Sequence, residues 1–162
     1  MTFESQLSDF LEGYDKLMVL GIGNELKCDD GVGPYIIKKF KQTTLDESQK
    51  LLFIDAQTVP ENFTGKIRKE NPSHLIIIDA CLMGCEPGEM KIVDKHDFAD
   101  IGISTHSMSL SYFVRFLEKG NDDLRIIFVG IEPESMDYAD MPTEKVENAA
   151  NDFINIFNEI IL

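Results

Sequence analysis

Short runs of apolar residues, unbroken by polar positions, recur along the chain at wide intervals. A strand with one solvated face alternates polar and apolar residues, whereas a strand buried on both faces is apolar throughout. The runs therefore predict the strands of a sheet that helices cover on both sides. The predicted strands are residues 17–21, 51–55, 75–79 and 125–130.

Segments with apolar residues at helical spacing lie between these runs. The helix predicted over residues 107–118 is expected to turn Met108, Tyr112, Phe113 and Phe116 inward. The other helices of the domain are predicted over residues 34–40, 61–70 and 143–161.

A further strand is predicted at residues 89–93, which follow a Pro-Gly turn and are expected to form an antiparallel edge. The alternation of strands and helices indicates an α/β domain with a twisted, mostly parallel sheet of about five strands.

The first sixteen residues form a separate pattern. Phe3, Leu7, Phe10 and Leu11 recur at helical spacing in a polar background. They predict an amphipathic helix that packs against the domain or against a second copy of the chain. We therefore divide the chain into an N-terminal helical extension, 1–16, and a single α/β domain, 17–162.

Composition narrows the classes of function. The 162 residues carry a net charge of −14 without a basic run, and such a surface repels nucleic acid. The apolar runs are too short to span a membrane, and the start, MTFESQLSDF, lacks the pattern of a secretory signal. Three cysteines, an odd and sparse set, fit a reducing compartment. We expect a soluble, cytoplasmic protein.

Candidate chemistry gathers where the predicted strands end. Ligands of open α/β sheets bind beyond the carboxyl ends of the strands, where Asp30, Asp79 and His106 are expected. Each has a structural alternative: Asp29 or Asp30 as a helix cap, Asp79 as a polar strand end, and His106 among good capping residues. Together, two carboxylates and an imidazole form a set that can hold a divalent metal with open positions, or activate water.

Other sites fit the sequence less well. The turn at Gly21-Ile-Gly23 lacks the third glycine of a dinucleotide fingerprint, and the pair Asp29-Asp30 would repel a pyrophosphate. No Walker lysine or G-x-S-x-G elbow occurs. Cys81 is a conceivable nucleophile without an activating signal, and Cys81-x-x-x-Cys85 lacks the second ligand pair of a zinc site. His74 and His96 are interpreted as structural or solvated.

Several motifs, in order, resemble those of the nickel-iron hydrogenase maturation endopeptidases. The likeness is greatest to the type that serves formate-hydrogenlyase-like or coenzyme-F420-reducing hydrogenases. The motifs are GIGNELKCDDGVG at 21–33, VPEN at 59–62, LIIIDA at 75–80, MGxxPGE at 83–89, STH at 104–106 and FVGIxP at 128–133, where x is any residue.

The resemblance implies a three-layer α/β sandwich and a peptidase domain over 17–162. It implies an aspartyl endopeptidase that removes the C-terminal extension of a hydrogenase large-subunit precursor after nickel insertion. Metal contacts and catalysis would fall on Asp30, Asp79 and His106, with nickel supplied by or shared with the substrate and no nucleotide cofactor. The glycine loop would present Asp30 to a cation, with Asn24 bracing the turn.

Two departures from the family pattern stand out. The segment Asp55-Ala-Gln-Thr58 replaces a common Asp-Gly-Gly turn, which puts the backbone freedom of that loop in question. The residues up to Lys16 precede the usual start of the family.

Two alternatives remain at this point. Peptidyl-tRNA hydrolase also begins with a G-x-G-N turn, but its following motifs are missing here and the charge opposes tRNA. A nickel-binding chaperone or scaffold for hydrogenase assembly would use the same three ligands without proteolysis.

Overall fold

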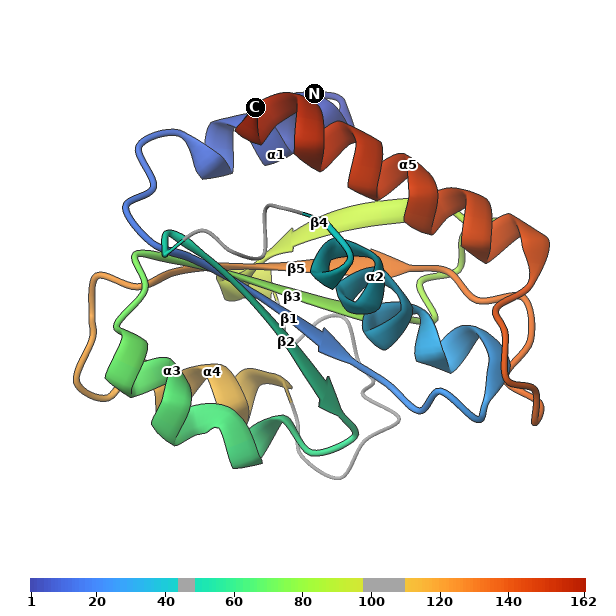
Figure 1. Cartoon of the computed structure of the whole chain (residues 1–162), viewed down its shortest axis with the longest axis horizontal. Helices are drawn as coiled ribbons and strands as arrows, with labels where there is room; N and C mark the ends of the chain where they lie inside the picture. Colours follow the sequence, from blue (N-terminus) through green and yellow to red (C-terminus); the bar gives the residue numbers. More distant parts are fainter. Residues whose placement is uncertain (44–48, 98–109) are drawn as a thin grey trace.

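One twisted sheet runs through the middle of the molecule (Figure 1). The structure is a computed structural model that describes residues 1–43, 49–97 and 110–162. Within these ranges the sheet has five strands in the order β2-β1-β3-β5-β4, and only β4 runs antiparallel to its neighbour. The predicted mostly parallel sheet with an antiparallel edge is confirmed. The strands are β1 (Leu17–Ile22), β2 (Leu51–Gln57), β3 (His74–Ala80), β4 (Met90–Asp94) and β5 (Arg125–Ile131).

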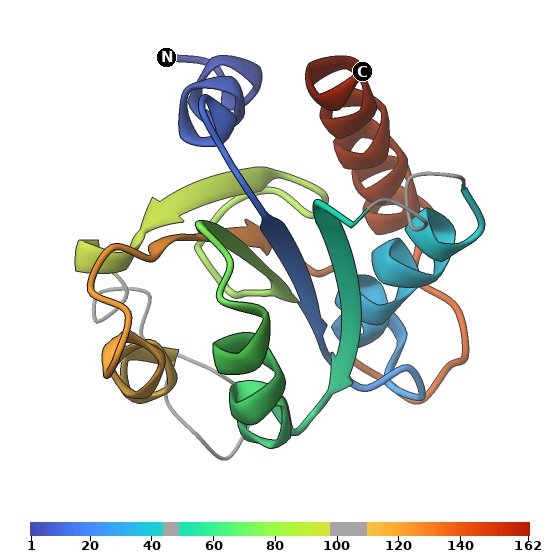
Figure 2. The same cartoon turned by 60° about the vertical axis from the view of Figure 1, so that its left-hand side comes forward.

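Helices cover both faces of the sheet, as Figures 1 and 2 show from two directions. One layer holds α1 (Phe3–Leu11), α2 (Val32–Lys41) and α5 (Glu144–Ile161). The opposite layer holds α3 (Thr64–Glu70) and α4 (Leu110–Glu118). This is the predicted three-layer α/β sandwich. None of the helices in the described ranges has both the length and the apolar character needed to cross a bilayer.

Each inner strand contributes to two hydrophobic clusters. Leu17 and Val19 of β1 pack with α1, α2 and α5, while Met18 and Leu20 pack with α3 and α4. Successive side chains of a strand point to opposite faces, so a strand between two helical layers needs apolar residues at every position. Every residue of β1 and β3 is buried, which confirms the interpretation of the unbroken apolar runs.

The orientation of α4 differs from the prediction. Tyr112 is 58% exposed and Phe116 is 38% exposed, whereas Phe113 and Leu117 are almost fully buried. The buried stripe is therefore shifted by one residue, and the Arg68 guanidinium lies 4.4 Å from the centre of the Phe116 ring. Met108, predicted to face inward, lies outside the described residues.

The order of the strands creates a topological switch point at one edge of the sheet. From β1 the chain crosses through α2 to β2 on one face, then returns through α3 on the other face to β3, on the far side of β1. The two crossovers diverge at the carboxyl ends of β1 and β3. Such a switch point is where open α/β sheets bind ligands.

The N-terminal helix is part of the core. Leu7, Phe10 and Leu11 of α1 are buried in the cluster that includes α5, and the Phe3 ring meets that of Phe153 edge-on at 6.2 Å. The predicted packing of this helix against the domain is confirmed. The division of the chain after residue 16 stays a prediction.

Truncating the buried side of α1 should therefore destabilise the protein. Leu7→Ala is expected to lower the free energy of unfolding by about 2–5 kcal/mol, because Leu7 is fully buried and a cavity would remain. Asp9→Ala, on the exposed side of the same helix, is the matched control and should change it by less than about 0.5 kcal/mol. Urea denaturation of both variants measures the difference. Equal stability of the two would contradict the role assigned to α1.

Candidate functional site at the carboxyl edge of the sheet

The glycine loop after β1 brings the start of α2 directly onto the ends of two strands. A Cβ added to Gly33 would lie 2.5 Å from the carbonyl oxygen of Ile22 and 2.8 Å from that of Ile78. Gly23 has a φ of +150°, and its added Cβ would lie 1.8 Å from the carbonyl oxygen of Asp30. No side chain fits at either position, so these glycines allow the backbone to pack this closely. The packing places the residues before α2 at the switch point.

Asp30 lies in the short 3-10 helix η1 (Cys28–Gly31) and is only 4% exposed. Its Oδ2 accepts a hydrogen bond of 3.0 Å from the backbone N–H of Asn24. The Asn24 side chain accepts in turn from the backbone N–H of Leu26 at 2.9 Å, which confirms that Asn24 braces the turn. Asp30 is thus held by the loop that carries it.

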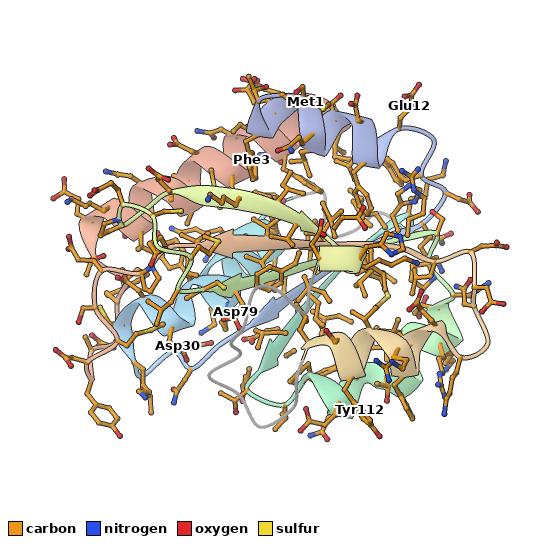
Figure 3. The ribbon with its side chains drawn as sticks, turned by 180° about the vertical axis from the view of Figure 1, so that it is seen from behind. Met1, Phe3, Glu12, Asp30, Asp79 and Tyr112 are labelled. Carbon is orange, nitrogen blue, oxygen red and sulfur yellow. The ribbon has the colours of Figure 1, made fainter. Side chains whose placement is uncertain are left out.

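Asp79 is the second residue from the end of β3 and is 5% exposed. Figure 3 shows Asp30 and Asp79 at the same edge of the sheet, where η1 contacts β3. Carboxylates are rarely this buried unless they have hydrogen-bond or charge partners or belong to a functional site. The structure therefore brings together two of the three predicted site residues.

The third predicted residue, His106, lies outside the described residues. In the described ranges no group of three His, Cys, Asp or Glu side chains is placed to hold a metal ion. The three-ligand set of Asp30, Asp79 and His106 therefore stays a prediction.

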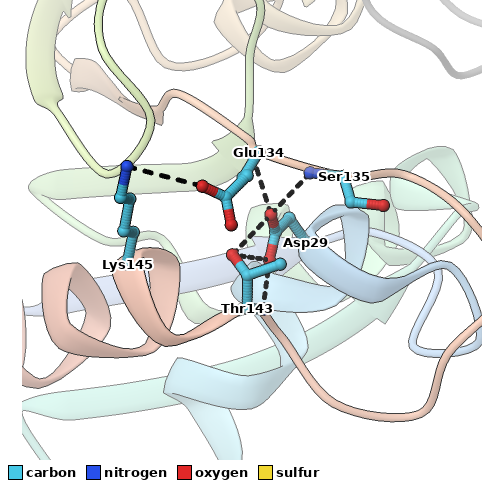
Figure 4. Close-up of polar contacts among 5 residues, drawn as sticks. All are labelled: Asp29, Glu134, Ser135, Thr143 and Lys145. Atoms are coloured by element: carbon cyan, nitrogen blue, oxygen red, sulfur yellow. Dashed lines mark hydrogen bonds and ion pairs between the residues drawn. The ribbon is translucent and has the colours of Figure 1, made fainter.

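Asp29 has a different role from its neighbour. It is fully buried, and its Oδ2 accepts from the backbone N–H groups of Glu134 (2.8 Å) and Ser135 (3.0 Å). Its Oδ1 accepts from the backbone N–H of Thr143 at 2.6 Å, and the Thr143 hydroxyl also reaches the carboxylate (Figure 4). Neither aspartate caps α2, whose N-cap is Gly31. Asp29 instead ties η1 to the loop between β5 and α5.

Two residues other than glycine adopt left-handed backbone conformations beside the site. Cys28 has a φ of 55° and Gln57 a φ of 50°. At Gln57 the conformation is supported on both sides: its N–H donates to Asp55 at 3.1 Å, and its carbonyl accepts from Gly23 N–H at 2.8 Å. The loop that lacks the usual glycines thus makes its turn with Gln57, at a steric cost of about 1–2 kcal/mol.

A further buried carboxylate orders the loop after β3. Glu132 is 5% exposed and accepts from the backbone N–H groups of Met83 (2.8 Å) and Cys85 (3.0 Å). Burial first, and then the charges of Asp79 and Glu132, raise the pKa of the Cys81 thiol to about 11. Cys81 is therefore a protonated thiol in neutral solution, the opposite of an activated nucleophile.

Sequence reasoning considered Asp29 only as a helix cap and missed Glu132 as a structural carboxylate. For Glu132 a signal existed, because it directly follows β5. Both histidines interpreted as structural or solvated agree with that reading. His74 is buried against the Phe10 ring, and burial, together with the Arg125 charge, lowers its pKa, whereas His96 is exposed.

The fold places this chain among open α/β domains with a candidate site at the switch point of the sheet, and comparison with known proteins identifies the class of enzyme. The hydrogenase maturation protease family matches residues 34–160. A Methanocaldococcus jannaschii relative whose name places it among these proteases is 36% identical over 98% of this chain and 95% of its own. The hydrogenase 3 maturation protease of Escherichia coli is 33% identical over 82% of both chains.

Solved structures agree with the sequence relatives. The crystal structure of the NiFe hydrogenase maturation protease HycI from Thermococcus kodakarensis superimposes with a TM-score of 0.86 at 25% identity, over 96% of this chain and 97% of that one. The chain belongs to the hydrogenase maturation protease family, and it is accordingly a peptide-bond hydrolase.

The same substitution at two consecutive residues should have effects of very different size on stability. Asp29→Asn removes one of two oxygens that both accept backbone N–H bonds, leaving buried donors unpaired. It is expected to cost about 2–3 kcal/mol, or about 5–10 °C in Tm. Asp30→Asn keeps an oxygen for the Asn24 N–H and should change stability by less than about 1 kcal/mol.

Thermal unfolding of the two variants, followed by circular dichroism, measures this contrast. A Tm of Asp29→Asn at or above that of Asp30→Asn would show that Asp29 does not anchor the loop between β5 and α5.

Proposed function

We propose that this protein removes the C-terminal extension of a nickel-iron hydrogenase large-subunit precursor in the cytoplasm, after nickel has been inserted. Its relatives are named for hydrogenase maturation, which supports this kind of substrate. The observation that carries the proposal is the pair of buried carboxylates, Asp30 and Asp79, at the switch point of the sheet.

In this proposal the nickel belongs to the substrate and acts as a recognition tag. Asp30 and Asp79 supply oxygen ligands and His106 a nitrogen ligand, a donor set suited to a divalent ion with positions left for the ligands of the precursor. The protease would therefore bind a precursor that carries nickel more tightly than one that does not. Because Asp79 is held on a strand and Asp30 on a braced turn, their oxygens need little ordering when the substrate arrives.

Cleavage then needs a water molecule and a base. The water oxygen attacks the carbonyl carbon of the scissile peptide bond while Asp30 or Asp79 accepts its proton. The C–N bond breaks, and the proton passes to the leaving amine. This route needs no protein nucleophile, which agrees with the burial of Cys81.

Replacing each proposed ligand should abolish processing without unfolding the protein. Asp30→Asn, Asp79→Asn and His106→Ala are each expected to lower the rate of cleavage of nickel-loaded precursor by orders of magnitude. Mass spectrometry of the products and a thermal melt of each variant measure the two effects. Folded ligand variants that cleave at the wild-type rate would contradict the proposed site, and wild-type protein that binds the precursor without cleaving it would indicate a scaffold.

Cys81→Ser serves as the test of the nucleophile. Cys81 is 3% exposed and packs in the hydrophobic cluster between the sheet and the α3–α4 layer, so its sulfur is poorly placed to reach a substrate carbonyl. The variant should therefore process nickel-loaded precursor within about threefold of the wild-type rate. A folded but inactive Cys81→Ser protein, beside active ligand variants, would favour covalent catalysis instead.

A further inference from the structure

Large apolar side chains exposed to solvent are concentrated around the candidate site. Two of those in the described ranges are near the chain ends and two lie on α4. All the others lie in loops that follow the carboxyl ends of parallel strands, at the edge that holds Asp30 and Asp79. They are Leu26 after β1 (65% exposed), Val59 after β2 (36%), Leu82 after β3 (56%), and Tyr138 (85%) and Met141 (53%) after β5.

We propose that these five side chains, the apolar rim, dock an extended apolar segment of the precursor polypeptide that the protease cleaves. The inference rests on the proposed function and deepens it by assigning the surface that recognises protein rather than metal. Isolated exposed apolar residues are ordinary, but a group that borders one site marks an interaction surface.

Backbone hydrogen bonds and the Asp29 carboxylate hold the loops that carry Leu26, Tyr138 and Met141. The carbonyl of Leu26 accepts from Ala139 N–H at 3.0 Å, and Ala139 accepts from Cys28 N–H at 3.0 Å, so the Leu26 and Tyr138 loops run side by side. Asp29 fixes both ends of the segment that carries Tyr138 and Met141. A surface whose backbone is already ordered loses little entropy when a partner binds.

The same hydrogen bonds connect the rim to the site. Asp29 is adjacent to Asp30 in η1. Glu132 orders the loop of Leu82 by accepting from the N–H of Met83, which lies four residues beyond Asp79. A polypeptide lying on the rim would therefore place one of its peptide bonds near the two carboxylates. This continuity with the site favours the cleaved substrate over any other occupant.

Charge restricts the chemistry of the docked segment. The chain carries a net charge of −14, and Asp137 and Asp140 flank Tyr138 on an exposed loop. Acidic segments would be repelled from this edge, whereas apolar segments with neutral or basic neighbours would be accepted.

The test compares a rim variant with a matched control. The rim variant carries Leu26→Ser, Tyr138→Ser and Met141→Ser, and the control carries Leu162→Ser, a residue that is 88% exposed at the far end of α5 from this edge (Figure 1). The probes are the purified nickel-loaded large-subunit precursors of the same organism. The KM and kcat for cleavage, and the Kd for binding, are measured for each protein.

Because the rim contributes to binding rather than to chemistry, the rim variant should raise KM and Kd by about tenfold or more, with kcat within about threefold of wild type. The control should leave all three unchanged. Tyr138→Ser alone should raise KM in the same direction, which covers the case in which the triple variant fails to fold.

The remaining outcomes distinguish a failure of the docking inference from a failure of the proposed function. If wild-type protein binds precursor without cleaving it, and the rim variant loses that binding, the docking inference stands while the peptidase proposal fails. A folded rim variant with wild-type KM and Kd would overturn the inference, and so would a fall in kcat at unchanged KM. A wild-type dimer that the rim variant dissolves would also overturn it, because a second copy would then cover the surface.

Discussion

The carboxylate of Asp29 joins parts of the chain that are 105 to 114 residues apart in sequence. A fully buried carboxylate is stable only when hydrogen bonds replace its water, and backbone N–H groups of the loop before α5 provide them. The loop gains as well, because its own N–H groups find an acceptor. Since Asp30 is the next residue, the same hydrogen bonds also hold in place the backbone that carries Asp30 at the candidate site.

Close packing of backbone completes this edge. The start of α2 rests on the carbonyl groups of Ile22 and Ile78, which is possible only because Gly33 has no side chain. Two adjacent buried carboxylates result, Asp29 as an anchor and Asp30 as a candidate site residue. An exposed rim of apolar side chains surrounds them on loops that are held by hydrogen bonds.

Prediction from the sequence succeeded where a pattern has one structural solution. Unbroken apolar strands require cover on both faces, so the three layers follow from β1 and β3 alone. It failed on α4, where neighbouring aromatic residues allow two rotations of a nine-residue helix. Packing against α3, with Arg68 stacked on Phe116, selects the rotation that buries Phe113 and Leu117.

The sequence by itself determined the fold class, the edge of the sheet that carries the candidate site and the family motifs, because each depends on local periodicity or on residue type at a strand end. Only the tertiary structure showed that Asp29, the neighbour of the predicted site residue Asp30, anchors a distant loop. The two residues have the same side chain, and their difference lies in the backbone N–H groups that surround Asp29, which come from a loop more than a hundred residues away. No local pattern records such a contact, because it exists only when the sheet has assembled.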